Sequence, residues 1–179
     1  NKLFVKYLND NNVTNILTLD YSPGTPCKVR ATYRDKLLAK DAPKVQETKH
    51  EFPIPGQVVD AQSATAAWLA AHPAGSGKLA IWSCFADPTE GAVAALNQAG
   101  RTDIPIFTWD FNKTILVPLQ KGQIEADLYL NAPKVGSQIA TLVKHYLSTK
   151  KPEGLVGSNE ILNKSNVDAF VKANPSSVQ

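Results

Sequence analysis

The 179-residue sequence has no methionine and only two cysteines, Cys27 and Cys84. Two cysteines are too few for a disulfide scaffold, and their separation does not fit a metal-binding knuckle. The three histidines, His50, His72 and His145, are dispersed along the chain and show no paired metal-ligand spacing. These absences exclude a disulfide-rich scaffold, and the sequence predicts no metal site.

Long apolar runs are also lacking. No run approaches the roughly 18 residues of a transmembrane helix, and no charged segment leads from Asn1 into a signal-type apolar core. The net charge is only +3, and the Lys and Arg residues are scattered among acids. We therefore expect no nucleic-acid partner. The hydrophobic content of 43% is sufficient for one packed domain of this length.

Motifs for nucleophilic catalysis and for phosphate binding are missing as well. The segment Gly75-Ser76-Gly77-Lys78 lacks the upstream glycine of a phosphate loop and precedes a strand instead of opening a helix. No Ser or Cys elbow motif is available to partner the histidines. The sequence predicts neither catalytic residues nor a cofactor. An active site assembled from distant residues is the enzymatic alternative that stays open.

What the sequence does contain is a regular alternation of strand-like and helix-like segments. Extended segments are predicted at residues 15–21, 44–52, 79–83, 104–109, 124–130 and 155–162. Helices are predicted at residues 1–10, 26–40, 57–71, 89–99, 114–120, 134–147 and 166–173. Repeated strand–helix units favour an α/β fold with a doubly wound parallel sheet, right-handed crossovers and helices on both faces.

Several polar residues stand directly after these strands, and in open parallel sheets ligands bind outside the carboxyl ends of the strands. Asp110 is either a ligand contact, or a turn acid or N-cap acid for the helix predicted from residue 114. Asp87 is either a ligand contact or the cap of the helix predicted from residue 89. Asn131 offers a donor and an acceptor to a pair of hydroxyls, or it is a turn residue before Ala132-Pro133.

Aromatic residues gather at the same strand ends. Trp82, Phe85, Trp109 and Phe111 surround the ends of the third and fourth strands. Aromatic faces stack on the C–H face of a sugar, but large aromatic side chains otherwise belong in the core. Alternation along the strands assigns Trp82 and Trp109 to the core, which leaves Phe85 as the candidate ligand contact.

The two cysteines also lie near strand ends. The favoured interpretation is that Cys27 and Cys84 are two free, half-buried thiols. If the first and third strands are neighbours in the sheet, the two thiols could instead meet near the binding cleft.

The order of these landmarks resembles that of the sugar-binding periplasmic proteins of the ribose-binding type, which have the type I periplasmic-binding-protein fold. The landmarks are Asp87, Gly91-Ala92, Gly100-Arg101-Thr102-Asp103, Asp110, the turn Pro23-Gly24-Thr25 and the tail Asn163-Lys164-Ser165-Asn166-Val167-Asp168. The resemblance implies a parallel sheet with strand order 2-1-3-4-5.

The resemblance also implies a domain organisation. In this family two lobes enclose the ligand, and residues 1–179 match only part of one such domain. Residues 1–131 together with 155–179 are expected to form the second lobe. Residues 132–154 are expected to carry a crossover helix that normally packs on the missing first lobe. The apolar stripe of this helix should then lie bare; its residues are Val135, Ile139, Leu142, Val143 and Tyr146.

The site residues that the resemblance implies are Arg30, Phe85, Asp87, Asp110 and Asn131. The family has an arginine after the Pro-Gly-Thr type of turn, followed by a glycine and an aromatic residue. Here Tyr33 and Arg34 follow Arg30, so Arg34 is the alternative for this role. The planar guanidinium fork suits paired hydroxyl or carboxylate oxygens.

The function implied by the resemblance is reversible capture of a small sugar or polyol between two lobes, without catalysis. We expect a periplasmic or extracellular protein of the cell envelope that delivers its ligand to the membrane permease of an ABC importer or to a chemoreceptor. The alternative is the effector-binding domain of a sugar-responsive transcription repressor. A Rossmann-type enzyme is disfavoured because the glycine-rich fingerprint is absent.

Overall fold

The centre of the molecule is a sheet whose middle strands are buried on both faces. The computed structural model describes residues 1–154, 157 and 159–178. The strands are β1 (Asn15–Asp20), β2 (Gln46–Glu51), β3 (Leu79–Ser83), β4 (Ile106–Trp109), β5 (Ile124–Leu130) and β6 (Asn159–Leu162). Every residue of β3 and β4 is buried. Strands covered on both faces need apolar side chains on both, which explains the continuous apolar runs in the sequence.

Seven α-helices and two short 3₁₀ helices accompany the strands in the described part of the chain. They are α1 (Lys2–Asp10), α2 (Thr25–Asp41), α3 (Gln57–Ala71), α4 (Ala86–Gln98), η1 (Lys113–Ile115), α5 (Leu116–Lys121), α6 (Ala132–Thr149), α7 (Val167–Ala173) and η2 (Pro175–Val178). The predicted helix at 89–99 begins three residues earlier than expected. Pro88 lies in its first turn, where the missing N–H has no partner to lose.

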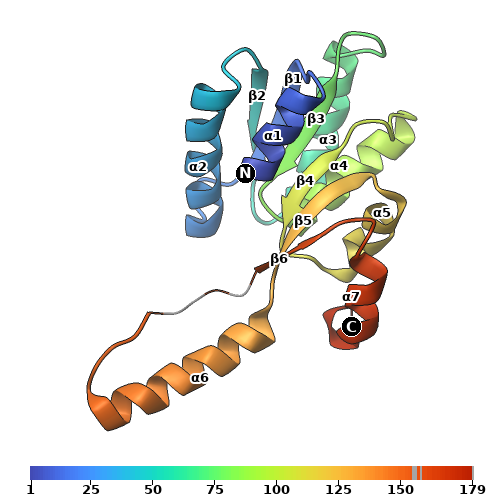
Figure 1. The fold of residues 1–179 in the computed structure, drawn as a ribbon. Helices are drawn as coiled ribbons and strands as arrows, with labels where there is room; N and C mark the ends of the chain where they lie inside the picture. Colours follow the sequence, from blue (N-terminus) through green and yellow to red (C-terminus); the bar gives the residue numbers. More distant parts are fainter. Residues whose placement is uncertain (155–156, 158, 179) are drawn as a thin grey trace.

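The sheet has the strand order β2-β1-β3-β4-β5-β6 (Figure 1). Strands β1 to β5 are parallel, so the predicted order 2-1-3-4-5 is confirmed. The structure adds β6, which pairs antiparallel with β5. The extended segment predicted at 155–162 is confirmed at Asn159–Leu162, whereas Leu155, Val156 and Ser158 lie outside the described residues.

Helices cover both faces of the sheet, as two adjacent residues of β4 demonstrate. The ring of Phe107 lies 5.1 Å from that of Phe4 and 5.2 Å from that of Tyr7, both in α1. The hydroxyl of the next residue, Thr108, lies 2.7 Å from the hydroxyl of Thr89 in α4. Successive residues of a strand point to opposite faces, so α1 and α4 lie on opposite sides of the sheet.

Helices α3 and α4 pack with their backbones in close contact. A Cβ atom on Gly91 of α4 would lie 2.1 Å from the carbonyl oxygen of Val58 and 2.8 Å from the amide nitrogen of Gln62. Only a residue without a side chain allows this approach.

Helix α6 projects away from the sheet and the other helices (Figure 1). None of its residues is buried. Ile139, Val143 and Tyr146 of the apolar stripe are 47%, 51% and 50% exposed. Val135 and Leu142 are half-buried, so most of the stripe is left uncovered by the described chain.

Candidate functional site

The carboxyl ends of the five parallel strands meet at one edge of the sheet, which we call the carboxyl edge. The residues that directly follow these strands are Tyr21 after β1, Phe52 after β2, Cys84 and Phe85 after β3, Asp110 after β4 and Asn131 after β5. Arg30, in the second turn of α2, reaches the same edge. The site residues predicted from separate parts of the sequence thus gather on one side of the sheet.

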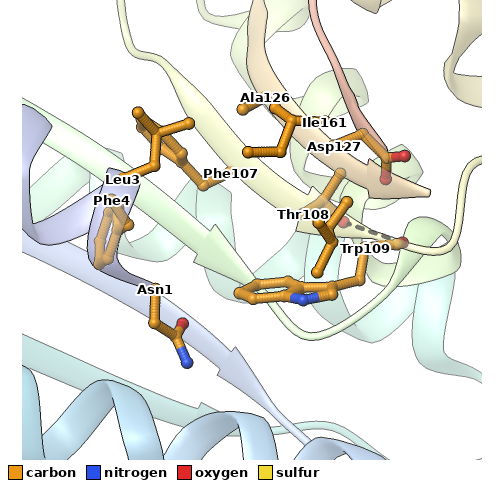
Figure 2. Close-up of a pocket in the computed structure, with 10 residues that line it drawn as sticks. Asn1, Leu3, Phe4, Phe107, Thr108, Trp109, Ala126, Asp127 and Ile161 are labelled. Atoms are coloured by element: carbon orange, nitrogen blue, oxygen red, sulfur yellow. Dashed lines mark hydrogen bonds between the residues drawn. The ribbon is translucent and has the colours of Figure 1, made fainter. Parts of the chain in front are cut away.

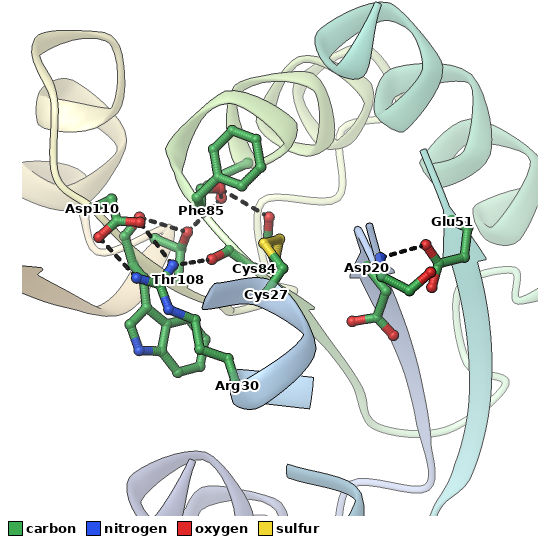
Figure 3. The surroundings of a disulfide bond; sticks show 12 residues. Asp20, Cys27, Arg30, Glu51, Cys84, Phe85, Thr108 and Asp110 are labelled. Atoms are coloured by element: carbon green, nitrogen blue, oxygen red, sulfur yellow. Dashed lines mark hydrogen bonds and ion pairs between the residues drawn. A yellow bond between two sulfur atoms is a disulfide. The ribbon is translucent and has the colours of Figure 1, made fainter. Parts of the chain in front are cut away.

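Arg30 and Asp110 form a two-pronged ion pair at this edge (Figure 3). Nη1 of Arg30 donates to Oδ2 of Asp110 at 2.7 Å, and Nη2 donates to Oδ1 at 3.1 Å. Nη1 also donates to the carbonyl oxygen of Cys84 at 2.6 Å. The Arg30 and Asp110 side chains stay 20% and 41% exposed, so both are accessible to a ligand. Three of the five N–H donors of a guanidinium are used within the described chain, which leaves two for ligand oxygens.

The backbone places Asp110 in an uncommon conformation. Its φ angle is +66°, in the left-handed region that aspartate tolerates better than most residues. The alternative that Asp110 caps a helix is wrong, because Asn112 caps η1 through its Oδ1 atom, which accepts from the amide nitrogens of Thr114 and Ile115. The carboxylate of Asp110 is instead held at the edge by Arg30.

Beneath the ion pair lie two tryptophans. Trp82 and Trp109 are buried, as their strand positions predict, and their rings pack edge to face at 4.9 Å. The guanidinium carbon of Arg30 lies 5.6 Å from the centre of the Trp109 ring, within the range of a cation–π interaction. The Trp109 ring therefore supports Arg30, and Trp82 packs against Trp109 from the core.

Three aromatic side chains extend the carboxyl edge toward β2. Phe85 is half-buried at the N-terminus of α4, and its ring packs edge to face on Phe52 at 5.7 Å. Phe52 in turn stacks on Tyr21 at 5.8 Å. Phe85 was predicted from the sequence as a site residue, whereas Tyr21 and Phe52 were not, because each was predicted as the last residue of a strand.

Asp87 and Asn131 each use one side-chain oxygen within the protein. Oδ2 of Asp87 accepts from Nε2 of Gln57 in α3 at 2.9 Å. The cap interpretation of Asp87 is wrong, because α4 begins at Ala86 and Asp87 lies inside its first turn. Oδ1 of Asn131 accepts from the amide nitrogen of Lys134 and caps α6. Contact of either residue with a ligand stays a prediction.

The two cysteines are bonded to each other, so the prediction of two free thiols is wrong. The Cα atoms of Cys27 and Cys84 are 5.4 Å apart. Strands β1 and β3 are hydrogen-bonded neighbours, so the start of α2, which follows β1, lies beside the end of β3. Cys27 belongs to the first turn of α2 and faces Cys84 from there.

Arg34, the alternative to Arg30, belongs to the interior of the protein. Its side chain is fully buried and donates to Asp20 at 2.7 and 2.9 Å. The guanidinium also lies 4.2 Å from the ring of Trp82. Burial alone would lower the pKa of Arg34, but the hydrogen bond and charge of Asp20, together with Glu47 and Asp35, hold it above its ordinary value. The geometry thus brings Arg30, and not Arg34, to Asp110.

A buried carboxyl group that the sequence analysis missed lies beside this site. Asp127 of β5 is 0% exposed and pairs in register with Thr108 of β4. Neither of its carboxylate oxygens makes a well-formed hydrogen bond in the described chain, although the backbone N–H of Phe111 acts on the group. Burial raises the pKa of Asp127 to about 7, and the negative charge of Asp110 acts in the same direction. The signal in the sequence is weak, because β5 contains two acids, Glu125 and Asp127, and only Asp127 is buried.

Asp127 also borders a small cavity between α1 and the β4, β5 and β6 strands (Figure 2). The cavity has a volume of about 60 Å³ and a mostly apolar lining that includes Phe4, Phe107 and Ile161. Pockets for small ligands usually have volumes of about 300–1,000 Å³, so this cavity is too small for a sugar ring. The candidate ligand site is therefore the open carboxyl edge.

Two further features are absent from residues 1–154, 157 and 159–178. No three His, Cys, Asp or Glu side chains among them come together as they would around a metal ion. None of the helices in this part of the chain combines the length and apolar character needed to cross a bilayer.

Comparison with known proteins gives a consistent result. A family model described as a periplasmic binding protein domain matches residues 2–151. An ABC transporter solute binding protein from Agrobacterium vitis, solved with bound allitol, is 27% identical with a TM-score of 0.80. An ABC sugar transporter subunit from Rhodobacter sphaeroides 2.4.1 is 25% identical with a TM-score of 0.76. No curated protein matches the chain.

The matches cover most of this chain but only part of the solved structures. They span 96% of the chain and 61% of the A. vitis protein, and 92% of the chain and 61% of the R. sphaeroides protein. A periplasmic ribose ABC transporter protein from Conexibacter woesei, at 14% identity and a TM-score of 0.81, shares the fold. The chain thus spans about three fifths of the length of these structures.

Proposed function

This chain belongs to the family of periplasmic binding protein domains, a binding-protein family and not an enzyme family, and from that premise we propose that it binds a small sugar or polyol reversibly at the carboxyl edge. The observation that carries the proposal is the ion pair between Arg30 and Asp110. A charged pair with free donors and acceptors can bind neighbouring hydroxyls, and charge-assisted hydrogen bonds are stronger than neutral ones.

The aromatic side chains beside this pair support a carbohydrate-like ligand. A polyol presents hydroxyls on its edge and C–H groups on its faces. Arg30 and Asp110 suit the hydroxyls, while the half-buried ring of Phe85, which packs on the buried Phe52, offers apolar surface to the C–H groups. The polyol in the similar A. vitis protein, allitol, belongs to this chemical class.

We further propose that the ligand is enclosed when a first lobe closes over the carboxyl edge. Residues 1–131 with 155–179 then act as the second lobe, and the helix within residues 132–154 packs on the first. The bare apolar stripe of α6 supports this arrangement, because exposed apolar surface of this kind marks an interaction site.

The proposed location is the periplasm or extracellular face of the cell envelope, where the protein delivers its ligand to the permease of an ABC importer or to a chemoreceptor. The disulfide between Cys27 and Cys84 supports an oxidising compartment. It argues against the repressor alternative, because thiols in the cytosol are kept reduced.

Titration calorimetry with allitol, ribose, arabinose, galactose, glucose and fucose tests the proposal. We expect at least one of these compounds to bind the wild-type chain, and Arg30→Gln to weaken that binding. Lys28→Gln is the matched control, because Lys28 is an exposed cation on the same helix whose side chain is not part of the ion pair. Equal affinity of the wild type and Arg30→Gln would remove Arg30 from the site.

A further inference from the structure

Cys84 holds α2 at the carboxyl edge by two separate contacts. Its sulfur is bonded to Cys27, and its carbonyl oxygen accepts from Nη1 of Arg30 at 2.6 Å (Figure 3). Cys27 and Arg30 are three residues apart, so they lie on the same face of the helix. The covalent bond and the Arg30 side chain therefore connect one face of α2 to one residue of the sheet.

This arrangement restricts how α2 can move relative to β3 and β4. The helix begins at Thr25, so the disulfide fixes its first turn and Arg30 follows in the second. A small rotation or shift of the first turn would displace the guanidinium, which must match Cys84 and both oxygens of Asp110 at once. The arginine side chain also has many rotamers. A helix turn that is held in place restricts these rotamers before binding, which reduces the side-chain entropy lost when a ligand binds.

We propose that the Cys27–Cys84 disulfide is a positioning element for ligand binding, which keeps Arg30 paired with Asp110 in the geometry that the ligand recognises. Without the disulfide the chain still folds, but the Arg30 guanidinium exchanges between several arrangements and the affinity falls. The positioning of Arg30 is independent of the proposed function; its effect on affinity rests on that function.

A purely structural disulfide is the competing explanation, since Cys27 and Cys84 are both buried. The two explanations differ in what they predict for Arg34, the other arginine of α2. Arg34 pairs with Asp20 and contacts neither cysteine through a hydrogen bond. A positioning role affects Arg30 and spares Arg34, whereas a general loosening of the fold affects both.

The first experiment needs no ligand. NMR spectra of the guanidinium groups report whether rotation about the Cζ–Nε bond is slow, as in a held bidentate pair. We expect separate Nη1 and Nη2 signals for Arg30 and Arg34 in the wild type. In Cys27→Ala/Cys84→Ala we expect the Arg30 signals to merge and the Arg34 signals to stay separate. Unchanged Arg30 signals, or merging for both arginines, would overturn the proposal.

The second experiment measures affinity, with allitol as the probe, in a double-mutant cycle. Cys27→Ala/Cys84→Ala should weaken binding by roughly tenfold in the wild-type background. In the Arg30→Gln background the same change should weaken binding by less than about twofold, because there is no arginine left to position. Equal losses in both backgrounds would show a purely structural role.

The two experiments distinguish failure of the proposed function from failure of the proposed positioning role. If neither allitol nor the other sugars bind the wild type, the proposed function fails, while the NMR experiment still decides whether the disulfide positions Arg30. If the double variant does not fold, the wild type reduced with dithiothreitol replaces it in both experiments, because reduction removes the bond and leaves the sequence unchanged.

Discussion

The negative charge of Asp110, which follows β4, helps to raise the pKa of Asp127 in the adjacent strand β5. Burial is the main cause that raises the pKa of Asp127 to about 7, and the negative charge of Asp110 is the second. The backbone N–H of Phe111 and the charge of Arg30 act in the opposite direction but are outweighed. Asp127 is thus a carboxyl group that titrates near neutral pH next to the candidate ligand site.

This pKa predicts how stability depends on pH. Between about pH 4 and pH 7 the folded protein keeps a proton on Asp127 that the unfolded chain has lost. The unfolded state then binds fewer protons, so the free energy of unfolding falls as the pH rises through this window. The rise of the Asp127 pKa from 3.8 to about 7 can change the free energy of unfolding by at most on the order of 4 kcal/mol across this window.

Asp127→Asn removes the titrating group with little change in shape. We expect the variant to gain stability relative to the wild type as the pH rises from 4 to 7, and the difference to level off above pH 7. Urea unfolding at a series of pH values measures this difference. A constant difference across the series would show that the pKa of Asp127 is not raised.

Replacement of Asp110 should weaken ligand binding. Removing one partner from a desolvated charged hydrogen bond costs on the order of 2–3 kcal/mol, so Asp110→Ala should reduce affinity roughly thirty- to a hundredfold. Asp103→Asn is the control in calorimetry with the sugar and polyol panel, because Asp103 pairs with Arg101 before β4, away from the carboxyl edge. Loss of affinity in both variants alike would contradict the assignment of Asp110.

Arg34 should influence stability and not recognition. Arg34→Ala leaves the buried carboxylate of Asp20 without its partner, which typically costs about 3–5 kcal/mol. Denaturant unfolding should show this loss, whereas Lys28→Ala on the same helix should change stability by less than about 0.5 kcal/mol. The ligand affinity of the folded fraction of Arg34→Ala should stay close to that of the wild type.

Gly91 should tolerate no side chain. In Gly91→Ala the new methyl group would overlap the backbone of α3 at Val58, and forced overpacking costs about 1–3 kcal/mol or more. Gly136→Ala in α6 is the opposite case, because its Cβ would have no neighbour within 4 Å. For Gly136→Ala we expect the free energy of unfolding to rise by about 0.5–1 kcal/mol, because alanine reduces the conformational entropy of the unfolded chain. Thermal unfolding of both variants measures the contrast.

The apolar stripe of α6 should cause the 179-residue chain to associate, either by dimerisation through this helix or by exchange of the helix between protomers. Burial of apolar surface contributes about 25 cal/mol per Å², which favours covering the stripe. Sedimentation at increasing concentration should reveal the dimer, and Ile139→Glu/Val143→Glu should abolish it. Thr141→Glu, a change to another exposed residue of α6, should not. A monomeric wild type at high concentration would contradict the prediction.

Most of the fold could be predicted because strands such as Leu79–Ser83 are covered on both faces, so that their apolar runs are unbroken. The strand order followed from the resemblance to a known family. The sequence could not predict that β6 runs antiparallel. Four residues, Asn159–Leu162, carry no information on direction, which depends on where the chain returns after α6.

The positions of Asp110 and Phe85 at the carboxyl edge could be predicted, because an acid and an aromatic residue there follow the ends of predicted strands. The disulfide could not be predicted, because Cys27 lies in a helix, and its distance to Cys84 depends on the pairing of β1 with β3. The burial of Asp127 was hidden for a related reason. An acid in a strand is exposed or buried according to which elements pack over that strand, and this is a property of the tertiary fold.

The pairing of β5 with β6 has a mechanical consequence for α6. Leu130 is paired with Asn159, so the chain leaves the sheet toward α6 and re-enters it through two adjacent residues. The two links between the sheet and α6 therefore lie side by side at the pair Leu130–Asn159. A rotation of α6 about this pair would leave the five parallel strands in place, so the distance between Arg30 and Asp110 would not change.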